Sequence, residues 1–129
     1  MVDALRQCGL DVHGSDVDNE RDFLGSERIE GADAIITNPP YTLAREFIEH
    51  SLTLMKPVGG LVAMLLRTDF DHAKTRSHLF QGCLAFAQKL VLTKRIVWFE
   101  RPGAAPSFNH AWFIWDWKHQ GPPTLAYVL

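Results

Sequence analysis

The chain is 129 residues long, 47% hydrophobic and 22% charged, with a formal net charge of −2. These values fit one globular domain and exclude collagen-like, disordered and disulfide-dense chains. Its apolar runs are far shorter than the roughly 20 residues of a membrane-spanning helix, and its N-terminus lacks the basic and apolar regions of a secretory signal. We therefore expect a single domain, residues 1–129, located in the cytoplasm and without membrane contact.

The first third of the sequence predicts a helix followed by two strands. Residues 2–8 predict a short helix, because Gly9 accepts the left-handed conformation found at helix ends. Residues 10–17 alternate weakly and end in an acidic cluster, as strands of open α/β sheets often do. Residues 32–37 are apolar on both faces, which predicts a central parallel strand covered by helices on each side.

The next elements continue the alternation of strand and helix. Apolar residues recur at helical spacing from 43 to 55, with charged residues on the other face. A break at Lys56-Pro57-Val58-Gly59-Gly60 follows, and residues 61–66 form a fully apolar run typical of a buried strand. Strand, helix and strand with short connections predict a parallel sheet.

The last third predicts one more helix and a pair of strands. Residues 78–88 carry apolar side chains suited to a helix. Residues 89–100 and 111–117 are rich in β-branched and aromatic residues, and the loop between them favours an antiparallel pairing. Residues 124–129 are expected to add a short edge strand. The fold class is therefore α/β, with a mostly parallel sheet and a C-terminal antiparallel hairpin.

Charge is divided unevenly along the sequence. Residues 1–50 hold 4 Lys/Arg and 11 Asp/Glu, whereas the remainder holds 9 and 4. Two interpretations of the basic second half stay open: a surface that faces a nucleic acid, whose phosphates supply most non-specific affinity, or a solvated helix face. The cations concerned are Arg67, Lys74, Arg76, Lys89, Lys94, Arg95 and Arg101.

One tetrapeptide, Asn38-Pro39-Pro40-Tyr41, directly follows the predicted strand at 32–37. It should lie outside the carboxyl end of the sheet, where ligands bind in open α/β folds. The prolines fix the backbone and lack amide donors, so carbonyl groups are left to accept hydrogen bonds together with the Asn38 side chain. Such acceptors suit an exocyclic amine, and Tyr41 offers a ring for nucleobase stacking. A rigid turn after a strand is the alternative.

The tetrapeptide resembles the acceptor-amine motif of class I S-adenosylmethionine-dependent methyltransferases that modify planar nitrogens. The continuation Thr42-Leu43-Ala44-Arg45 and the aromatic run 108–116 are most similar to phage- and prophage-type N6-adenine DNA methyltransferases. The resemblance implies a Rossmann-like fold, S-adenosylmethionine as cofactor, and DNA carrying a target adenine as partner. It also implies that Asn38, Pro39, Pro40 and Tyr41 form the catalytic site.

The same resemblance implies a cofactor pocket in the acidic first half. Asp16 corresponds to the residue that binds the ribose hydroxyls, and Asp22 and Phe23 correspond to the adenine pocket. The alternatives are a solvated strand end for Asp16 and a surface acid beside a core ring for the other two.

The aromatic run also carries an implied substrate contact. Phe108 matches an aromatic that helps Tyr41 hold the extruded base in the family. Trp112, Phe113 and Trp115 stand at strand spacing, and we interpret them as core or face-covering residues. The segment from Arg67 to Phe70 either borders the substrate crevice or is a simple strand-end turn.

No metal is expected. The six histidines lack metal-ligand spacing and have no cysteine or carboxylate companions in a recognisable arrangement. Nor does the sequence contain a nucleophile elbow or a glycine-rich phosphate loop.

The sequence departs from the family pattern in two places. Family members place a strand and a glycine-rich loop before the first helix, and this sequence begins at that helix. It also leaves no room for a target-recognition domain after Trp117. We therefore expect a truncated Rossmann-like sheet and weakened cofactor affinity. Three arrangements of the sheet stay open: direct pairing of the remaining strands, a strand borrowed from another copy, or an open sheet edge that favours a homo-oligomer.

Three functional hypotheses follow from these observations. The first is methyl transfer from S-adenosylmethionine to the N6 amine of adenine in DNA. Within enzymes, a protein glutamine or an RNA base are alternative acceptors. The second hypothesis is an inactive module of the same fold that binds nucleic acid or a partner chain. The third is a purely structural fragment that dimerises through its open sheet.

Overall fold

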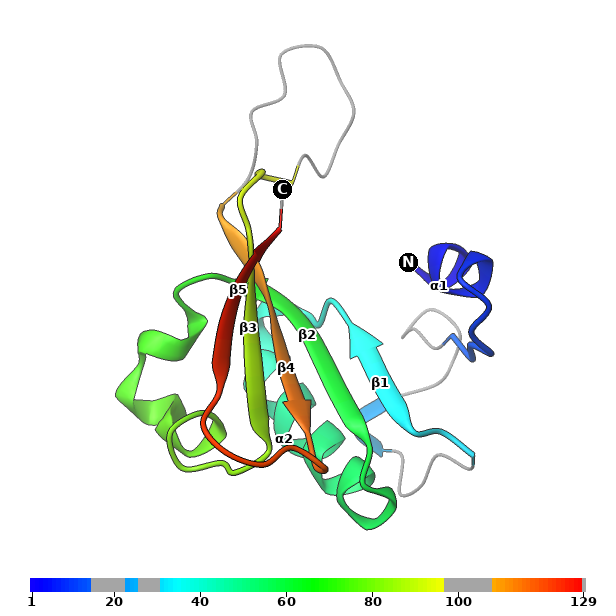
Figure 1. The fold of residues 1–129 in the computed structure, drawn as a ribbon, viewed down its shortest axis with the longest axis horizontal. Helices are drawn as coiled ribbons and strands as arrows, with labels where there is room; N and C mark the ends of the chain where they lie inside the picture. Colours follow the sequence, from blue (N-terminus) through cyan, green and yellow to red (C-terminus); the bar gives the residue numbers. More distant parts are fainter. Residues whose placement is uncertain (15–22, 26–30, 97–107, 129) are drawn as a thin grey trace.

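The computed structural model describes residues 1–14, 23–25, 31–96 and 108–128, which contain one five-stranded sheet. Its strand order is β1-β2-β4-β3-β5 (Figure 1). The strands are β1 (Ala34–Thr37), β2 (Leu61–Arg67), β3 (Phe86–Leu92), β4 (His110–Asp116) and β5 (Thr124–Val128). The pairs β1–β2 and β3–β5 are parallel, and β2–β4 and β3–β4 are antiparallel. The α/β class, the C-terminal antiparallel hairpin and the final edge strand are thus confirmed, in a mixed sheet.

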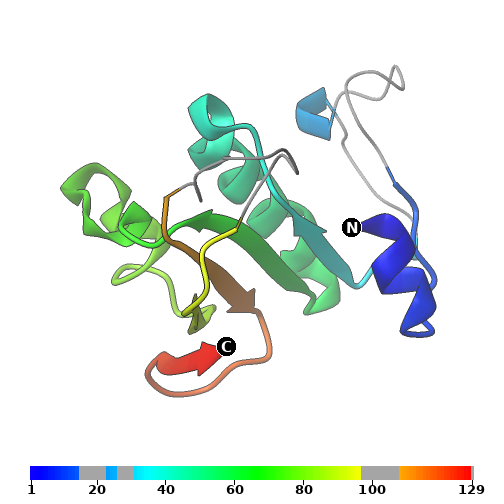
Figure 2. The same cartoon turned by 90° about the horizontal axis from the view of Figure 1, so that it is seen from above.

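Helix α2 (Ala44–Met55) connects β1 to β2 and covers one face of the sheet (Figures 1 and 2). Its apolar stripe is fully buried at Ile48 and almost fully at Met55. The stripe packs on alternate side chains of the two central strands, because residues two apart on a strand share a face. These partners are Val62, Met64, Leu66, Ala111, Phe113 and Trp115.

Two glycines end this helical segment and start β2. Gly59 has φ +64°, a left-handed conformation that closes the 3₁₀ turn Lys56–Val58. At Gly60 an added Cβ would stand 2.7 Å from both the Asp33 carbonyl oxygen and the Met55 sulfur. Only glycine allows β2 to start this close to the strand and helix before it.

An aromatic cluster fills the core beneath β3 and β4. Phe80 contacts Phe86, Phe113 and Trp115 with ring centroids 5.0, 5.5 and 5.6 Å away. The Trp115 indole nitrogen donates to the Leu79 carbonyl at 2.7 Å, which satisfies its only polar atom inside the core. The interpretation of Phe113 and Trp115 as core residues is confirmed, since both are fully buried.

The segment between β2 and β3 differs from the prediction. Instead of a helix over 78–88, it forms the 3₁₀ turns η5 (Phe70–His72) and η6 (Lys74–Leu79), and β3 already begins at Phe86. Gly82 interrupts the helical pattern at a cost of about 1 kcal/mol relative to alanine, and its amide turns back to the Ser77 carbonyl. Short turns are enough to bury Leu79 and leave Leu84 93% exposed.

The first strand is less central than its apolar sequence predicts. Within the described residues β1 pairs with β2 alone, and Ala34 is exposed. The expectation of helices on both faces is likewise unmet in the described part of the chain, because the core helix α2 lies on one face (Figure 2). A β-strand pattern can show that a segment is apolar, but not how many neighbours it has.

The N-terminal region agrees with the sequence in part. Helix α1 (Val2–Gln7) forms as predicted, followed by Gly9 with φ +87°. Of the predicted strand 10–17, residues 10–14 have no regular structure and 15–17 lie outside the described residues.

Candidate functional site

The carboxyl ends of two parallel strands and the start of a third meet at one edge of the sheet. Thr37 ends β1 opposite Met64, and Arg67 ends β2 opposite His110, the first residue of β4. The Thr68 amide donates to the Asn109 carbonyl at 3.0 Å and continues this pairing past the strand end. The topology therefore brings the Asn38–Tyr41 motif, Arg67 and Phe108 to the same edge.

The motif presents acceptors at this edge. Asn38 is exposed and Pro39 is buried, so the backbone is anchored while the asparagine side chain stays accessible. The Pro40 carbonyl accepts from the Leu43 amide at 3.0 Å, as the chain turns into η3 (Tyr41–Leu43) and then into α2. No donor among the described residues bonds the Pro39 carbonyl. Within the described residues, the Asn38 side chain and the Pro39 carbonyl therefore have no donor, whereas the Pro40 carbonyl already has one.

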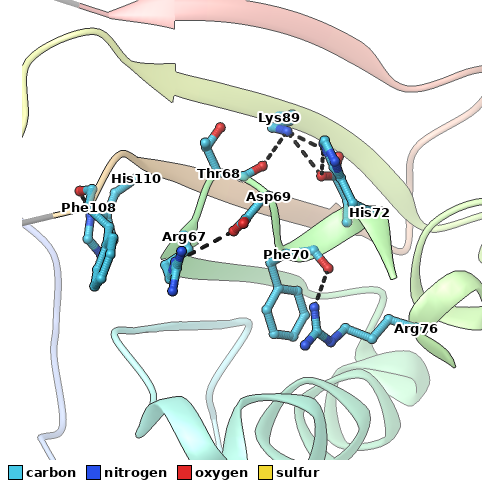
Figure 3. A network of polar contacts seen from close by, with 10 residues as sticks. Arg67, Thr68, Asp69, Phe70, His72, Arg76, Lys89, Phe108 and His110 are labelled. Atoms are coloured by element: carbon cyan, nitrogen blue, oxygen red, sulfur yellow. Dashed lines mark hydrogen bonds and ion pairs between the residues drawn. The ribbon is translucent and has the colours of Figure 1, made fainter. Parts of the chain in front are cut away.

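Two large aromatic rings stand exposed at the site. Tyr41 is 64% and Phe108 62% exposed, although 67 positions separate them in the sequence. Arg67 connects them: its guanidinium carbon lies 3.9 Å from the Phe108 ring centroid and 5.9 Å from that of Tyr41. Figure 3 shows the Arg67 and Phe108 side chains extending on the same side of the strand ends. The three residues form a small aromatic and cationic surface.

The loop after β2 is fixed by a lysine from β3 (Figure 3). Lys89 Nζ donates to the Thr68 carbonyl at 2.7 Å and to the two Asp71 carboxylate oxygens at 3.1 and 3.2 Å. Arg67 Nε lies 3.6 Å from Asp69 Oδ1, so both carboxylates of the loop face cations. Lys89 thus holds the backbone immediately after Arg67 in place.

Of the predicted cofactor residues, Asp16 and Asp22 lie outside the described residues. Phe23 is partly exposed and rests on α2, where its ring stacks on Phe47 at 5.1 Å and meets His50 edge-on at 5.1 Å. Phe23 therefore lies beside the helix that begins just after the motif, and not among the exposed aromatics at the strand ends.

Some residues of this region were missed or left undecided by the sequence. The segment from Arg67 to Phe70 was expected either to border the substrate crevice or to be a simple strand-end turn. Arg67 borders the site, whereas Phe70 packs into the core and is 4% exposed, so each interpretation holds for one end of the segment. Nothing in the local pattern marks Lys89 or Arg76 as neighbours of the loop, because their contacts join separate elements. The only feature of the sequence that could have pointed to Lys89 and Arg76 is their charge.

The described residues contain no group of three or more His, Cys, Asp or Glu side chains placed to hold a metal. Among the same residues, every helix is too short or too polar to cross a bilayer. Comparison with known proteins adds nothing further: no family model matches the chain, and no curated protein matches it significantly.

Proposed function

We propose that this chain is a Rossmann-like methyltransferase domain that positions the N6 amine of adenine in DNA for methylation by S-adenosylmethionine. The observation that carries the proposal is the meeting of the Asn38–Tyr41 motif with Phe108 and Arg67 at one sheet edge. A set of free acceptors beside exposed aromatic rings is what an extruded base with an exocyclic amine requires.

The amine is held by acceptors only. The Asn38 side-chain carbonyl and the Pro39 carbonyl each accept one N–H of the amine, since neither has a partner among the described residues. Two such bonds orient the nitrogen lone pair toward the methyl donor. Fixing the acceptors on a proline-restrained backbone keeps this geometry without reorganisation, which is how positioning and electrostatics lower a barrier.

The base itself is held by stacking. Tyr41 and Phe108 are both more than half exposed, and base–aromatic stacking contributes about 1–3 kcal/mol per base. Arg67 lies against both rings in the described structure, so it borders the base and offers donors to ring nitrogens. Adenine has two such acceptors beside its amine, which favours adenine over a base with fewer acceptors there.

S-adenosylmethionine would supply the electrophilic methyl group. The residues proposed to hold it are Asp16, Asp22 and Phe23. Phe23 alone lies in the described part of the chain, where its partly exposed ring, fixed on Phe47, fits a role in packing on a flat ligand.

The first test separates cofactor binding from transfer. Calorimetry with S-adenosylmethionine and S-adenosylhomocysteine should detect binding that Asp16→Ala and Phe23→Ala weaken. Transfer of labelled methyl groups to adenine-containing DNA should then fall roughly 100- to 1000-fold in Asn38→Ala, the usual loss for one transition-state hydrogen bond. Gln120→Ala, exposed in the connection between β4 and β5 at the opposite end of the sheet, serves as the matched control.

Two outcomes would contradict the proposal in different ways. No binding at millimolar cofactor together with retained DNA binding would favour an inactive nucleic-acid-binding module. Transfer to RNA or to a glutamine-containing peptide, but not to DNA, would keep the amine grip and change the substrate class.

A further inference from the structure

A cavity of about 230 Å³ opens beside Tyr41, on the side where α2 begins. Its polar lining comes from two separate elements that face each other. Thr42, Arg45 and Glu46 lie at the start of α2 and in the turn before it, and Thr75 and Arg76 lie in η6. The proposed base site and this cavity therefore share Tyr41.

Arg76 is positioned as a fixed cation in this cavity. It donates through Nη1 to the Phe70 carbonyl at 2.8 Å, and its guanidinium carbon lies 4.1 Å from the Phe70 ring centroid (Figure 3). No carboxylate within the described ranges lies within ion-pair distance of Arg76. Its charge and its remaining N–H donors are therefore available to a ligand.

Arg45 faces it from α2. Its ion pairs are long and partly exposed: Nη2 lies 3.4 Å from Glu46 Oε1, and Nε lies 3.8 Å from Glu49 Oε1. Exposed pairs of this kind contribute little, so Arg45 exchanges them readily for a stronger anion. The cavity lining holds two arginines against the single Glu46, and the two threonine hydroxyls add further donors.

We infer that this cavity is a phosphate subsite for the nucleic-acid strand that carries the target base. A phosphodiester offers acceptors and a negative charge, which match two guanidinium groups and two hydroxyls. The cavity adjoins Tyr41, so the phosphate bound there is one that flanks the stacked base. The inference rests on the proposed function for the identity of the strand, but phosphate binding itself does not require methyl transfer.

The experiment measures binding of a fluorescent adenine-containing oligonucleotide by anisotropy at several salt concentrations, without cofactor. Arg45→Gln and Arg76→Gln should each weaken binding about fivefold or more, the effect of losing a charge-assisted hydrogen bond. Each should also reduce the slope of log affinity against log salt by about one. Thr75→Val should weaken binding without changing the slope, and Arg76→Lys should retain the slope.

The matched control is Lys118→Gln, which removes one exposed cation at the far end of the sheet. A second arm uses oligonucleotides with a single uncharged methylphosphonate next to the target adenine. Wild-type protein should bind the methylphosphonate oligonucleotide more weakly than the unmodified one. The difference in affinity between the two oligonucleotides should be no larger for Arg45→Gln than for wild type. If the cavity variants behave as Lys118→Gln does, or if wild type ignores the methylphosphonate, the subsite is wrong.

This design separates the two proposals. Phosphate-dependent binding without any methyl transfer would contradict the proposed reaction and leave the subsite standing. Methyl transfer that neither arginine substitution changes would contradict the subsite and leave the proposed reaction standing. Since Arg76 also contacts Phe70, thermal unfolding of each variant checks its fold, and Arg45→Gln and Thr75→Val test the inference even if Arg76→Gln is unstable.

Discussion

The molecule uses aromatic residues in two opposite ways. In the core, the rings of Phe80, Phe113 and Trp115 pack against one another, and the Trp115 indole nitrogen donates a hydrogen bond to the Leu79 carbonyl. At the strand ends, Tyr41 and Phe108 remain more than half exposed, with a guanidinium as their common neighbour. Burying a ring stabilises the fold, and the two rings left exposed at one end of the strands fit the proposed base-stacking surface.

Lys89 joins these two regions. Its ammonium group lies 5.2 Å from the centroid of the core ring Phe113 and also holds the loop that follows Arg67. The comparison predicts how much substitutions should lower the unfolding free energy. The loss should be largest for a core ring, intermediate for Lys89 and smallest for an exposed ring.

The largest effect is expected for Trp115→Ala. Removing a fully buried indole leaves a cavity among the core rings and an unpaired Leu79 carbonyl, which should cost about 3–5 kcal/mol of unfolding free energy. Chemical denaturation measures the loss. Trp112→Ala, on the other face of the same strand and only partly buried, should cost clearly less, and equal losses would contradict the assignment of the core to the α2 face.

An intermediate effect is expected for Lys89→Met, which keeps the chain length and removes the charge. Lys89 and Asp71 have side-chain exposures of 18% and 23%, so the change leaves a partly buried carboxylate and the Thr68 carbonyl without their donor. We expect the unfolding free energy, obtained from chemical denaturation, to fall by about 1–3 kcal/mol.

A double-mutant cycle with Asp71→Asn checks the cause of that loss. The two residues are in contact, so their effects should be non-additive by about 0.5 kcal/mol or more. Strict additivity would show that the lysine acts through its packing on Phe113 instead.

The sequence predicted the parts of this arrangement that depend on local patterns. Helix α2 follows from apolar periodicity and strand β2 from an uninterrupted apolar run, and the motif is predicted at a strand end because it directly follows another apolar run. Contacts between distant elements were beyond that reasoning. Arg67 meets Phe108 across 41 positions, and Arg76 reaches Phe70 through the 3₁₀ turns η5 and η6, which precede the predicted helix and leave no mark in the apolar pattern.

Backbone hydrogen bonding also limits what the sequence can predict about the Asn38–Tyr41 motif. The sequence shows two prolines without amide donors, but not that the Pro40 carbonyl is already used by the Leu43 amide. Which carbonyl remains for a ligand depends on the 3₁₀ turn at Tyr41–Leu43, and short turns of this kind leave little trace in apolar periodicity.

The smallest effect on stability, and the sharpest on binding, is expected for Tyr41→Ala. An exposed ring contributes little to the fold, so the unfolding free energy should change by less than about 0.5 kcal/mol. Oligonucleotide affinity should fall by about 1–3 kcal/mol if the ring stacks on a base, whereas Tyr41→Phe should retain it. A stability loss as large as that of Lys89→Met, with unchanged affinity, would show that Tyr41 belongs to the folding core and would remove the contrast between the two aromatic regions.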